Sequence, residues 1–116
     1  MADRRQPWWA RALRRVGVQV ATIPKPTLDP QAVAEGRIVF VHDDDTSPLV
    51  DVIRWASHTF RVPAAEAAVK VAQVHREGAA AFGPFAADDV AQVMERGRTE
   101  AERLGLAQLR FGPSPR

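Results

Sequence analysis

The chain has 116 residues, which is enough for one domain with a single hydrophobic core. It contains no cysteine, so a disulfide framework, a thiolate metal site and a cysteine nucleophile are excluded. No apolar run approaches the roughly 18 residues that a membrane-spanning helix needs, so no membrane association is expected.

The net charge of +2 is unevenly distributed along the chain. Residues 1–26 hold six basic residues and one acidic residue, which gives +5, and the remaining residues sum to −3. A dedicated nucleic-acid domain carries its positive charge on the folded surface, whereas here the charge belongs to an N-terminal segment. Nucleic acid is therefore not an expected partner.

Residues 1–36 are predicted to be a flexible, basic and proline-rich N-terminal extension. Residues 7–16 could form a short basic amphipathic helix, which is too short to be stable alone. Residues 23–30, IPKPTLDP, indicate an extended linker. The arginines are not followed by a sustained apolar core, so a secretory signal is not predicted. Disorder is the simpler interpretation, and a tryptophan-anchored docking segment is the alternative.

The stretch Ile38 to Pro48, IVFVHDDDTSP, organises the rest of the sequence. Its first four residues form a β-branched and aromatic run that predicts a buried strand. His42 and three aspartates, Asp43 to Asp45, follow this run. Thr46 or Ser47 is expected to cap the next helix, with Pro48 at its first position.

The predicted elements then alternate between helices and short strands. Apolar spacing predicts helices over 48–60, 63–77 and 87–104, and two further short strands over 79–85 and 107–111. Gly78 is placed as a left-handed helix terminator, and Gly83-Pro84 puts the second strand at an edge or a bend. This order, βααβαβ, predicts an α+β fold, a two-layer α/β sandwich in which a small three-stranded antiparallel sheet packs against three helices.

Enzymatic and metal sites are not indicated by the sequence. His42, His58 and His75 lack the close spacing of a zinc site, and the aspartate run lacks the glycine and glutamate of an EF-hand. No serine–histidine–acid set or glycine-rich phosphate loop is visible. We therefore expect neither an enzyme nor a cofactor.

The order of several short motifs resembles the ClpS family. These motifs are VHDDDTSP at 41–48, Val52, the pattern A-x-x-V-x-x-V-H-x-x-G at 68–78 and GPF at 83–85. ClpS proteins are small bacterial adaptors that recognise N-degrons for the ClpAP protease. The resemblance covers residues 37–111, which it implies are the core domain, and leaves 112–116 as a disordered end.

The resemblance implies a pocket for the first residue of a substrate chain. Asp43 would pair with the free α-amino group, and His75 would hydrogen-bond the same amine, with His42 beside them. Asp44 and Thr46 would lie on the rim. The implied apolar lining consists of Leu49 as the gate, Val52, Val71 and Val74.

The residue chemistry agrees with this assignment independently. A free N-terminus is a cation with three donors, which suits a carboxylate and a neutral imidazole acceptor. An apolar side chain needs a concave apolar wall, which aliphatic residues from two helices can supply.

Three departures from the family pattern distinguish this chain. His42 replaces the usual asparagine, and its protonation below a pH of about 6.5 would repel an incoming amine. Ser47 is inserted before the proline, which could shift Leu49. Val93 or Met94 stands where the family has a lysine that contacts the ClpA N-terminal domain.

The resemblance therefore implies a cytoplasmic bacterial adaptor. It would bind N-degron proteins or peptides through a free α-amine and a bulky apolar first side chain. It would deliver them to the N-terminal domain of a ClpA-type AAA+ unfoldase. Two alternatives stay open: a ClpS-like docking module that has lost amine binding, and a membrane or nucleic-acid binder that acts through residues 1–15.

Overall fold

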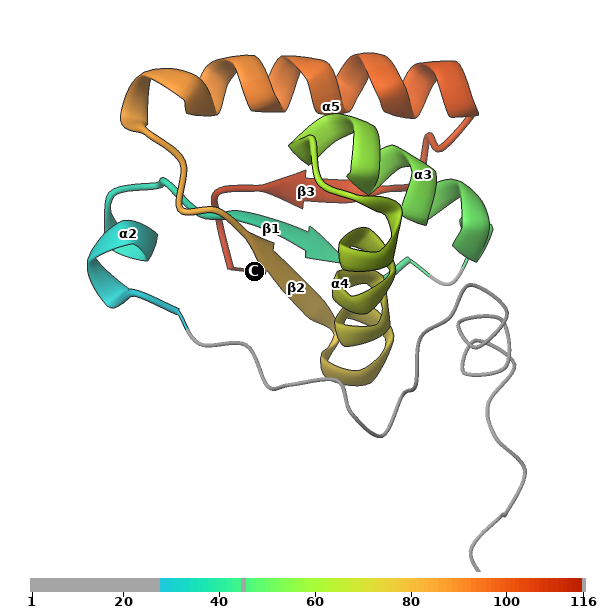
Figure 1. Ribbon diagram of the computed structural model, residues 1–116, viewed down its shortest axis with the longest axis horizontal. Coiled ribbons are helices and arrows are strands. Elements are labelled where there is room, and N and C mark those ends of the chain that lie inside the picture. The colour runs from blue at the N-terminus through green and yellow to red at the C-terminus, as the bar shows by residue number, and fades with distance from the viewer. Residues whose placement is uncertain (1–27, 45, 116) are drawn as a thin grey trace, which may run out of the picture.

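The computed structural model describes residues 28–44 and 46–115 of the chain. The expectations for the N-terminal helix, for most of the extension and for Asp45 fall outside these residues. In chain order the elements are α2 (Pro30–Ala34), β1 (Val39–His42), α3 (Leu49–Phe60), α4 (Ala64–Glu77), β2 (Ala79–Phe82), the 3₁₀ turn η2 (Ala87–Asp89), α5 (Val90–Leu104) and β3 (Arg110–Gly112). The predicted α+β class and the order of the main elements are confirmed (Figure 1).

The sheet has the strand order β2-β1-β3, and both pairs are antiparallel. The central strand is β1, which pairs Val41 with Ala80 on one side and with Phe111 on the other. The edge position predicted for β2 is confirmed, and this strand ends before Gly83 rather than at residue 85. The last strand is displaced toward the C-terminus, since it begins at Arg110 and not at residue 107.

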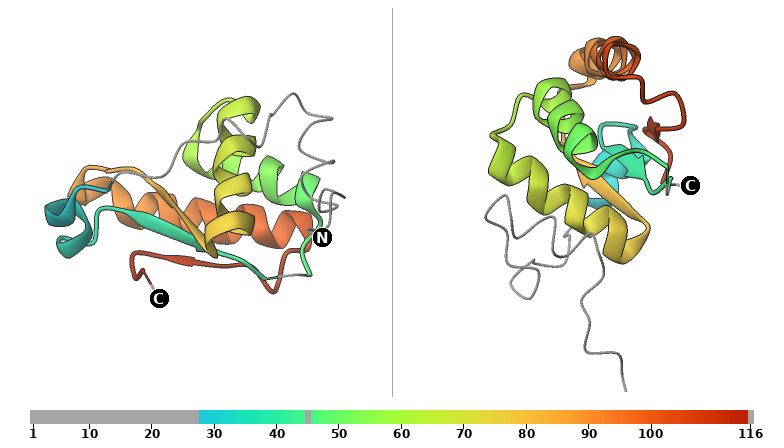
Figure 2. Two further views of the ribbon diagram at one scale, coloured as in Figure 1. Left: turned by 90° about the horizontal axis from the view of Figure 1, so that it is seen from below. Right: turned by 90° about the vertical axis from the view of Figure 1, so that its right-hand side faces the viewer.

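The two faces of β1 are covered by different elements, because successive side chains of a strand point to opposite faces. Val39 and Val41 belong to the main core, which is built against α3, α4 and α5 (Figures 1 and 2). Phe40 packs on the opposite face in a second cluster with Ala32 of α2. The sheet is therefore buried on both sides at its central strand.

The predicted boundary of the extension at residue 36 differs from the structure. Ala32 is fully buried, and Asp29 caps α2 by accepting a hydrogen bond from the backbone N–H of Gln31 at 3.0 Å. Pro30 begins this helix, which suits proline because its missing N–H is not needed there. Residues 30–34 thus form a helix in a range where the proline pattern had indicated a flexible extension.

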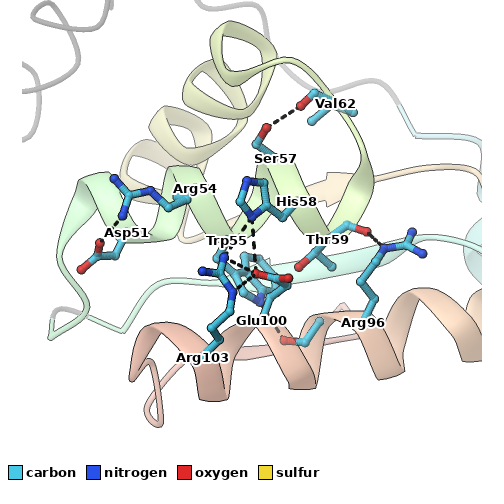
Figure 3. Close-up of polar contacts among 11 residues, drawn as sticks. Asp51, Arg54, Trp55, Ser57, His58, Thr59, Val62, Arg96, Glu100 and Arg103 are labelled. Carbon is cyan, nitrogen blue, oxygen red and sulfur yellow. Dashed lines mark hydrogen bonds and ion pairs between the residues drawn. The ribbon is translucent and has the colours of Figure 1, made fainter.

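Helices α3 and α5 are joined by a tryptophan that the apolar spacing of α3 did not single out. Trp55 is fully buried, and its indole Nε1–H donates to the carbonyl of Gly97 at 2.9 Å (Figure 3). Its ring packs against Phe111, with centroids 4.9 Å apart. A Cβ at Gly97 would lie 2.6 Å from the Phe111 ring, so a glycine is what allows this close approach.

Polar side chains contact one another at the exposed edge of the interface between α3 and α5. Arg103 donates to Glu100 at 2.6 Å, and His58 of α3 lies 3.4 Å from the same carboxylate (Figure 3). A hydrogen bond from Arg103 lowers the pKa of Glu100. Partial burial opposes this shift, and a hydrogen bond with His58 adds to it. These exposed pairs add little to stability individually, so the buried Trp55 contact carries the interface.

The turn that leads into α3 is held by a different residue from the one expected. Pro48 is the N-cap position and makes no side-chain cap, so Thr46 and Ser47 do not cap the helix. Instead Asp44 accepts hydrogen bonds from the backbone N–H groups of Thr46 and Ser47, at 2.9 and 2.8 Å, and from the Ser47 hydroxyl at 2.6 Å. A short acidic side chain commonly stabilises a turn in this way. The inserted Ser47 is therefore part of the turn structure.

Gly97→Ala is expected to lower the free energy of unfolding. Overpacking against Phe111 costs about 1–3 kcal/mol, which exceeds the gain of about 1 kcal/mol that alanine brings to a helix. Urea denaturation measures the difference. The double variant Gly97→Ala/Phe111→Leu should recover part of the loss, because the ring that the new methyl group meets is gone. Equal losses with and without Phe111 would contradict this account.

Asp44→Ala is expected to destabilise the protein at neutral pH by roughly 0.5–1.5 kcal/mol, because the turn loses its acceptors. Partial burial raises the pKa of Asp44, but hydrogen bonds from Ser47 and Thr46 outweigh it and lower the pKa below its ordinary value of 3.8. The carboxylate therefore stabilises the fold above pH 3.8 and loses this effect as the pH falls further.

Thermal unfolding between pH 2.5 and 7 tests this expectation. The gap between wild type and Asp44→Ala should narrow toward acid pH. Asp44→Asn, which keeps one acceptor oxygen, should fall between the two proteins at neutral pH. A gap that is constant over this range would show that the charge of Asp44 is not involved.

Candidate functional site

A small hollow lies at the end of β1. It is bounded by the turn that follows β1, by α3 and by α4. We call it the strand-end hollow. Its lining combines two acids and two imidazoles with apolar side chains. The residues are Val41, His42, Asp43, Asp44, Ser47, Val52, Val71, Val74, His75 and Leu109.

The acid and the imidazole of this hollow are brought together by a single backbone turn. Gly78 ends α4 in the left-handed conformation, with φ at +87°, and the chain then enters β2. The backbone N–H of Asp43 donates to the Gly78 carbonyl at 3.0 Å. His75 lies three residues before Gly78, in the last turn of α4. The end of β1 is thereby fixed beside the end of α4.

The resulting contact joins Asp43 and His75. The Oδ1 atom of Asp43 lies 3.5 Å from Nδ1 of His75, and their side chains are 31% and 14% exposed. This distance is longer than that of an ideal hydrogen bond. An ammonium nitrogen lies about 2.8 Å from each acceptor, so two acceptor atoms 3.5 Å apart are close enough for one ammonium group to contact both.

The apolar wall contains three of the four aliphatic residues that the resemblance implies. Val52 comes from α3, and Val71 and Val74 come from α4, where Val71 lies four residues before His75 and therefore on the same face. All three are at most 7% exposed. Sequence reasoning had not assigned Val41 and Leu109 to the wall. The alternation of β1 could have indicated Val41, whereas no local signal points to Leu109.

Two of the implied residues do not line the strand-end hollow. Leu49 is 4% exposed, belongs to the main core and is not among the residues that line the hollow. Thr46 is exposed and its described contacts are with Asp44. The turn held by Asp44 and Ser47 accounts for both placements, because it directs Thr46 outward and starts α3 with Leu49 facing the core.

His42 connects the hollow to the C-terminal segment. Its Nε2 atom lies 3.3 Å from the backbone carbonyl of Ser114. Gly112 of β3 and Ser114 thus make described contacts, although both lie in the range 112–116 that was predicted to be a disordered end. An imidazole that donates from Nε2 to this carbonyl has its acceptor at Nδ1.

Asp44 has a structural role, which makes its carboxylate oxygens less available to a ligand. Both of its oxygens accept hydrogen bonds from the turn. The carboxylate is nevertheless part of the lining, so it adds negative charge beside Asp43. The hollow thus favours a positively charged ligand even though Asp44 itself holds the turn.

The position that corresponds to the family's lysine is buried. Val93 is 4% exposed in the main core, and Met94 packs partly buried against the same core. Neither side chain presents a charged group on the surface of α5.

Other kinds of site are not supported by the described residues. Across residues 28–44 and 46–115, no group of three or more histidine and acidic side chains is arranged to hold a metal ion. None of the helices described in this part of the chain has the length and apolar character to cross a membrane.

Comparison with known proteins gives one match. The family described as "ATP-dependent Clp protease adaptor protein ClpS" matches residues 37–110, which is more than half of the chain. No curated protein and no solved structure matches. The matched range begins just before β1 and ends at the first residue of β3, so it contains all the residues that line the strand-end hollow. The chain therefore belongs to the ClpS family of Clp protease adaptors.

Proposed function

We propose that this adaptor binds the N-terminal residue of degron-bearing proteins in the strand-end hollow. The free α-amine would lie between Asp43 and His75, and the first side chain would lie against the valines of α3 and α4. The observation that carries this proposal is the 3.5 Å approach of Asp43 and His75 beside an apolar wall. The protein would then deliver its cargo to a ClpA-type AAA+ unfoldase in the bacterial cytoplasm.

The charges of the hollow suit a protonated amine. Asp43 supplies a formal negative charge, and a neutral His75 supplies an acceptor nitrogen. Acetylation would remove both the charge and two of the three donors of the ligand. Binding should therefore depend on a free N-terminus, as expected for terminal-amine capture.

Recognition of the side chain would rest on burial of apolar surface. Each square ångström removed from water contributes about 25 cal/mol, so a large first residue gains more than alanine does. Such a wall separates large from small side chains but discriminates poorly between leucine and phenylalanine.

A second candidate function is a docking module without amine binding. The volume of the strand-end hollow favours it, because about 20 Å³ holds little more than one water molecule. The changes at His42, Ser47 and Val93 point the same way. The two functions differ in whether a free amine is required, and this can be measured directly.

Isothermal titration calorimetry with short peptides separates the two candidates. The adaptor function predicts that peptides beginning with Phe or Leu bind, that a peptide beginning with Ala does not, and that acetylation abolishes binding. Asp43→Ala should weaken binding by roughly 1.5–3 kcal/mol, because a charge-assisted partner is lost. Asp88→Ala, which removes an exposed acid of η2 outside the hollow, is the control and should bind as wild type.

Equal binding of free and acetylated peptides, or no binding at all, would exclude amine capture. Binding to the isolated N-terminal domain of a ClpA-type unfoldase, measured by the same method, then tests the docking module. Because Val93 is buried, Val93→Lys is expected to destabilise the core rather than to strengthen this interaction. Tighter unfoldase binding by a stably folded Val93→Lys would contradict that expectation.

A further inference from the structure

The segment that follows β3 turns back toward the rim of the strand-end hollow. β3 ends at Gly112, and the chain bends at Pro113 and Ser114 (Figure 2). The Ser114 carbonyl then lies 3.3 Å from Nε2 of His42, which is paired across the sheet with Arg110, a residue that precedes Ser114 in the chain. The chain therefore reverses direction after β3 and returns to the end of β1.

His42 belongs both to this contact and to the lining of the hollow. Its side chain is partly buried, and it lines the hollow together with Asp43 and His75. The same ring contacts Ser114. His42 therefore connects the C-terminal segment to the place where the α-amine of a ligand is proposed to bind.

The Ser114 carbonyl determines which nitrogen of a neutral His42 carries the proton. A backbone carbonyl can only accept a hydrogen bond, so His42 donates to it from Nε2. A neutral imidazole has one protonated and one unprotonated nitrogen, so the acceptor of the ring is then Nδ1. A ring turned by half a revolution would place a carbon atom where Nε2 lies. The contact therefore selects one orientation of the ring as well as one tautomer.

A terminal ammonium group has more donors than Asp43 and His75 account for. It carries three N–H groups, and the proposed function provides one acceptor on Asp43 and one on His75, at atoms 3.5 Å apart. A donor that enters a hollow without an acceptor costs free energy, because it loses its hydrogen bond to water. His42 is a further lining residue that can offer a nitrogen acceptor, provided that Nδ1 is unprotonated.

We propose that the Ser114 carbonyl is a positioning group for the binding site. It holds His42 with Nε2 protonated, and Nδ1 accepts the third N–H of the α-amine. The segment after β3 thereby contributes to binding, although Ser114 is not among the residues that line the hollow. This inference rests on the proposed amine capture. It adds a contribution from a segment that lies outside the family match at 37–110.

Nitrogen-15 NMR of the imidazole rings tests the tautomer in the full chain. At mildly alkaline pH, where imidazoles are neutral, His42 should be protonated at Nε2 and unprotonated at Nδ1. A peptide that begins with Phe should shift the Nδ1 resonance of His42, and the acetylated peptide should not. The spectrum of His42→Asn identifies the signals, because it lacks this ring. A proton on Nδ1 of His42 would overturn the inference.

Two truncated chains test whether Ser114 contributes to affinity. A chain that ends at Pro113 lacks the carbonyl and should bind a Phe-first peptide about two- to tenfold more weakly, which is the factor expected for one neutral hydrogen bond. A chain that ends at Pro115 keeps Ser114, so it is the matched control and should bind as wild type. Isothermal titration calorimetry measures the affinities, and thermal unfolding checks that each chain is folded.

A double-mutant cycle with His42→Phe tests whether Ser114 acts through His42. This variant keeps an aromatic ring and removes both nitrogens, so truncation at Pro113 should have no further effect on its affinity. His42→Asn offers an amide acceptor that does not depend on an imidazole tautomer. Its affinity should likewise be insensitive to the truncation. If the chain that ends at Pro113 does not fold, the NMR spectrum of the full chain decides alone.

The outcomes separate failure of the positioning role from failure of amine capture. Wild type that binds none of the free-amine peptides would overturn the proposed function and the positioning role together. Amine-dependent binding that is equally strong with and without Ser114 would overturn the positioning role alone. An equal loss of affinity on truncation in wild type and in His42→Phe would also overturn it, because the segment would then act on the site without His42.

Discussion

The hydrogen bond from the Asp43 N–H to the Gly78 carbonyl is the contact on which the rest of the site depends. It continues the pairing of β1 with β2 by one step beyond the strands and attaches the end of β1 to the end of α4. Gly78 can accept this bond because its left-handed conformation turns the chain back immediately after the helix. One turn therefore fixes the positions of Asp43 and His75 relative to each other, although they are separated by 32 positions in the sequence.

The residues that the resemblance marks as departures from the family pattern each have a local structural partner. Ser47 donates its hydroxyl to Asp44, and His42 contacts the carbonyl of Ser114. Val93 fills part of the core under α5. The changes at these positions are therefore compatible with a folded and ordered site. The same contacts also reduce the number of polar atoms available to a ligand.

Much of the fold could be predicted from local sequence patterns. The β-branched run at 38–41 became the central strand, and the glycine at 78 ends its helix as expected. Val71 and His75 of α4 share one face because residues four positions apart are neighbours on a helix. Asp43 and His75 were assigned together through the resemblance, and the structure brings them within contact distance.

The features that could not be predicted depend on contacts between distant segments. Proline at position 30 indicated a linker, but Ala32 is buried because it meets Phe40 on the far face of the sheet. Trp55 joins the core through the Gly97 carbonyl on a helix 42 positions later. Leu109 lies in an irregular turn with no periodicity of its own, so only the packing of the folded chain reveals its place in the wall of the strand-end hollow.

A crystal structure of the protein with a peptide that begins with phenylalanine tests the account most directly. The account predicts that the α-amine nitrogen lies about 2.8 Å from both the Asp43 carboxylate and a ring nitrogen of His75. It also predicts that the phenyl ring packs against Val52, Val71 and Val74. A peptide bound with its amine away from Asp43 and His75 would contradict the central claim.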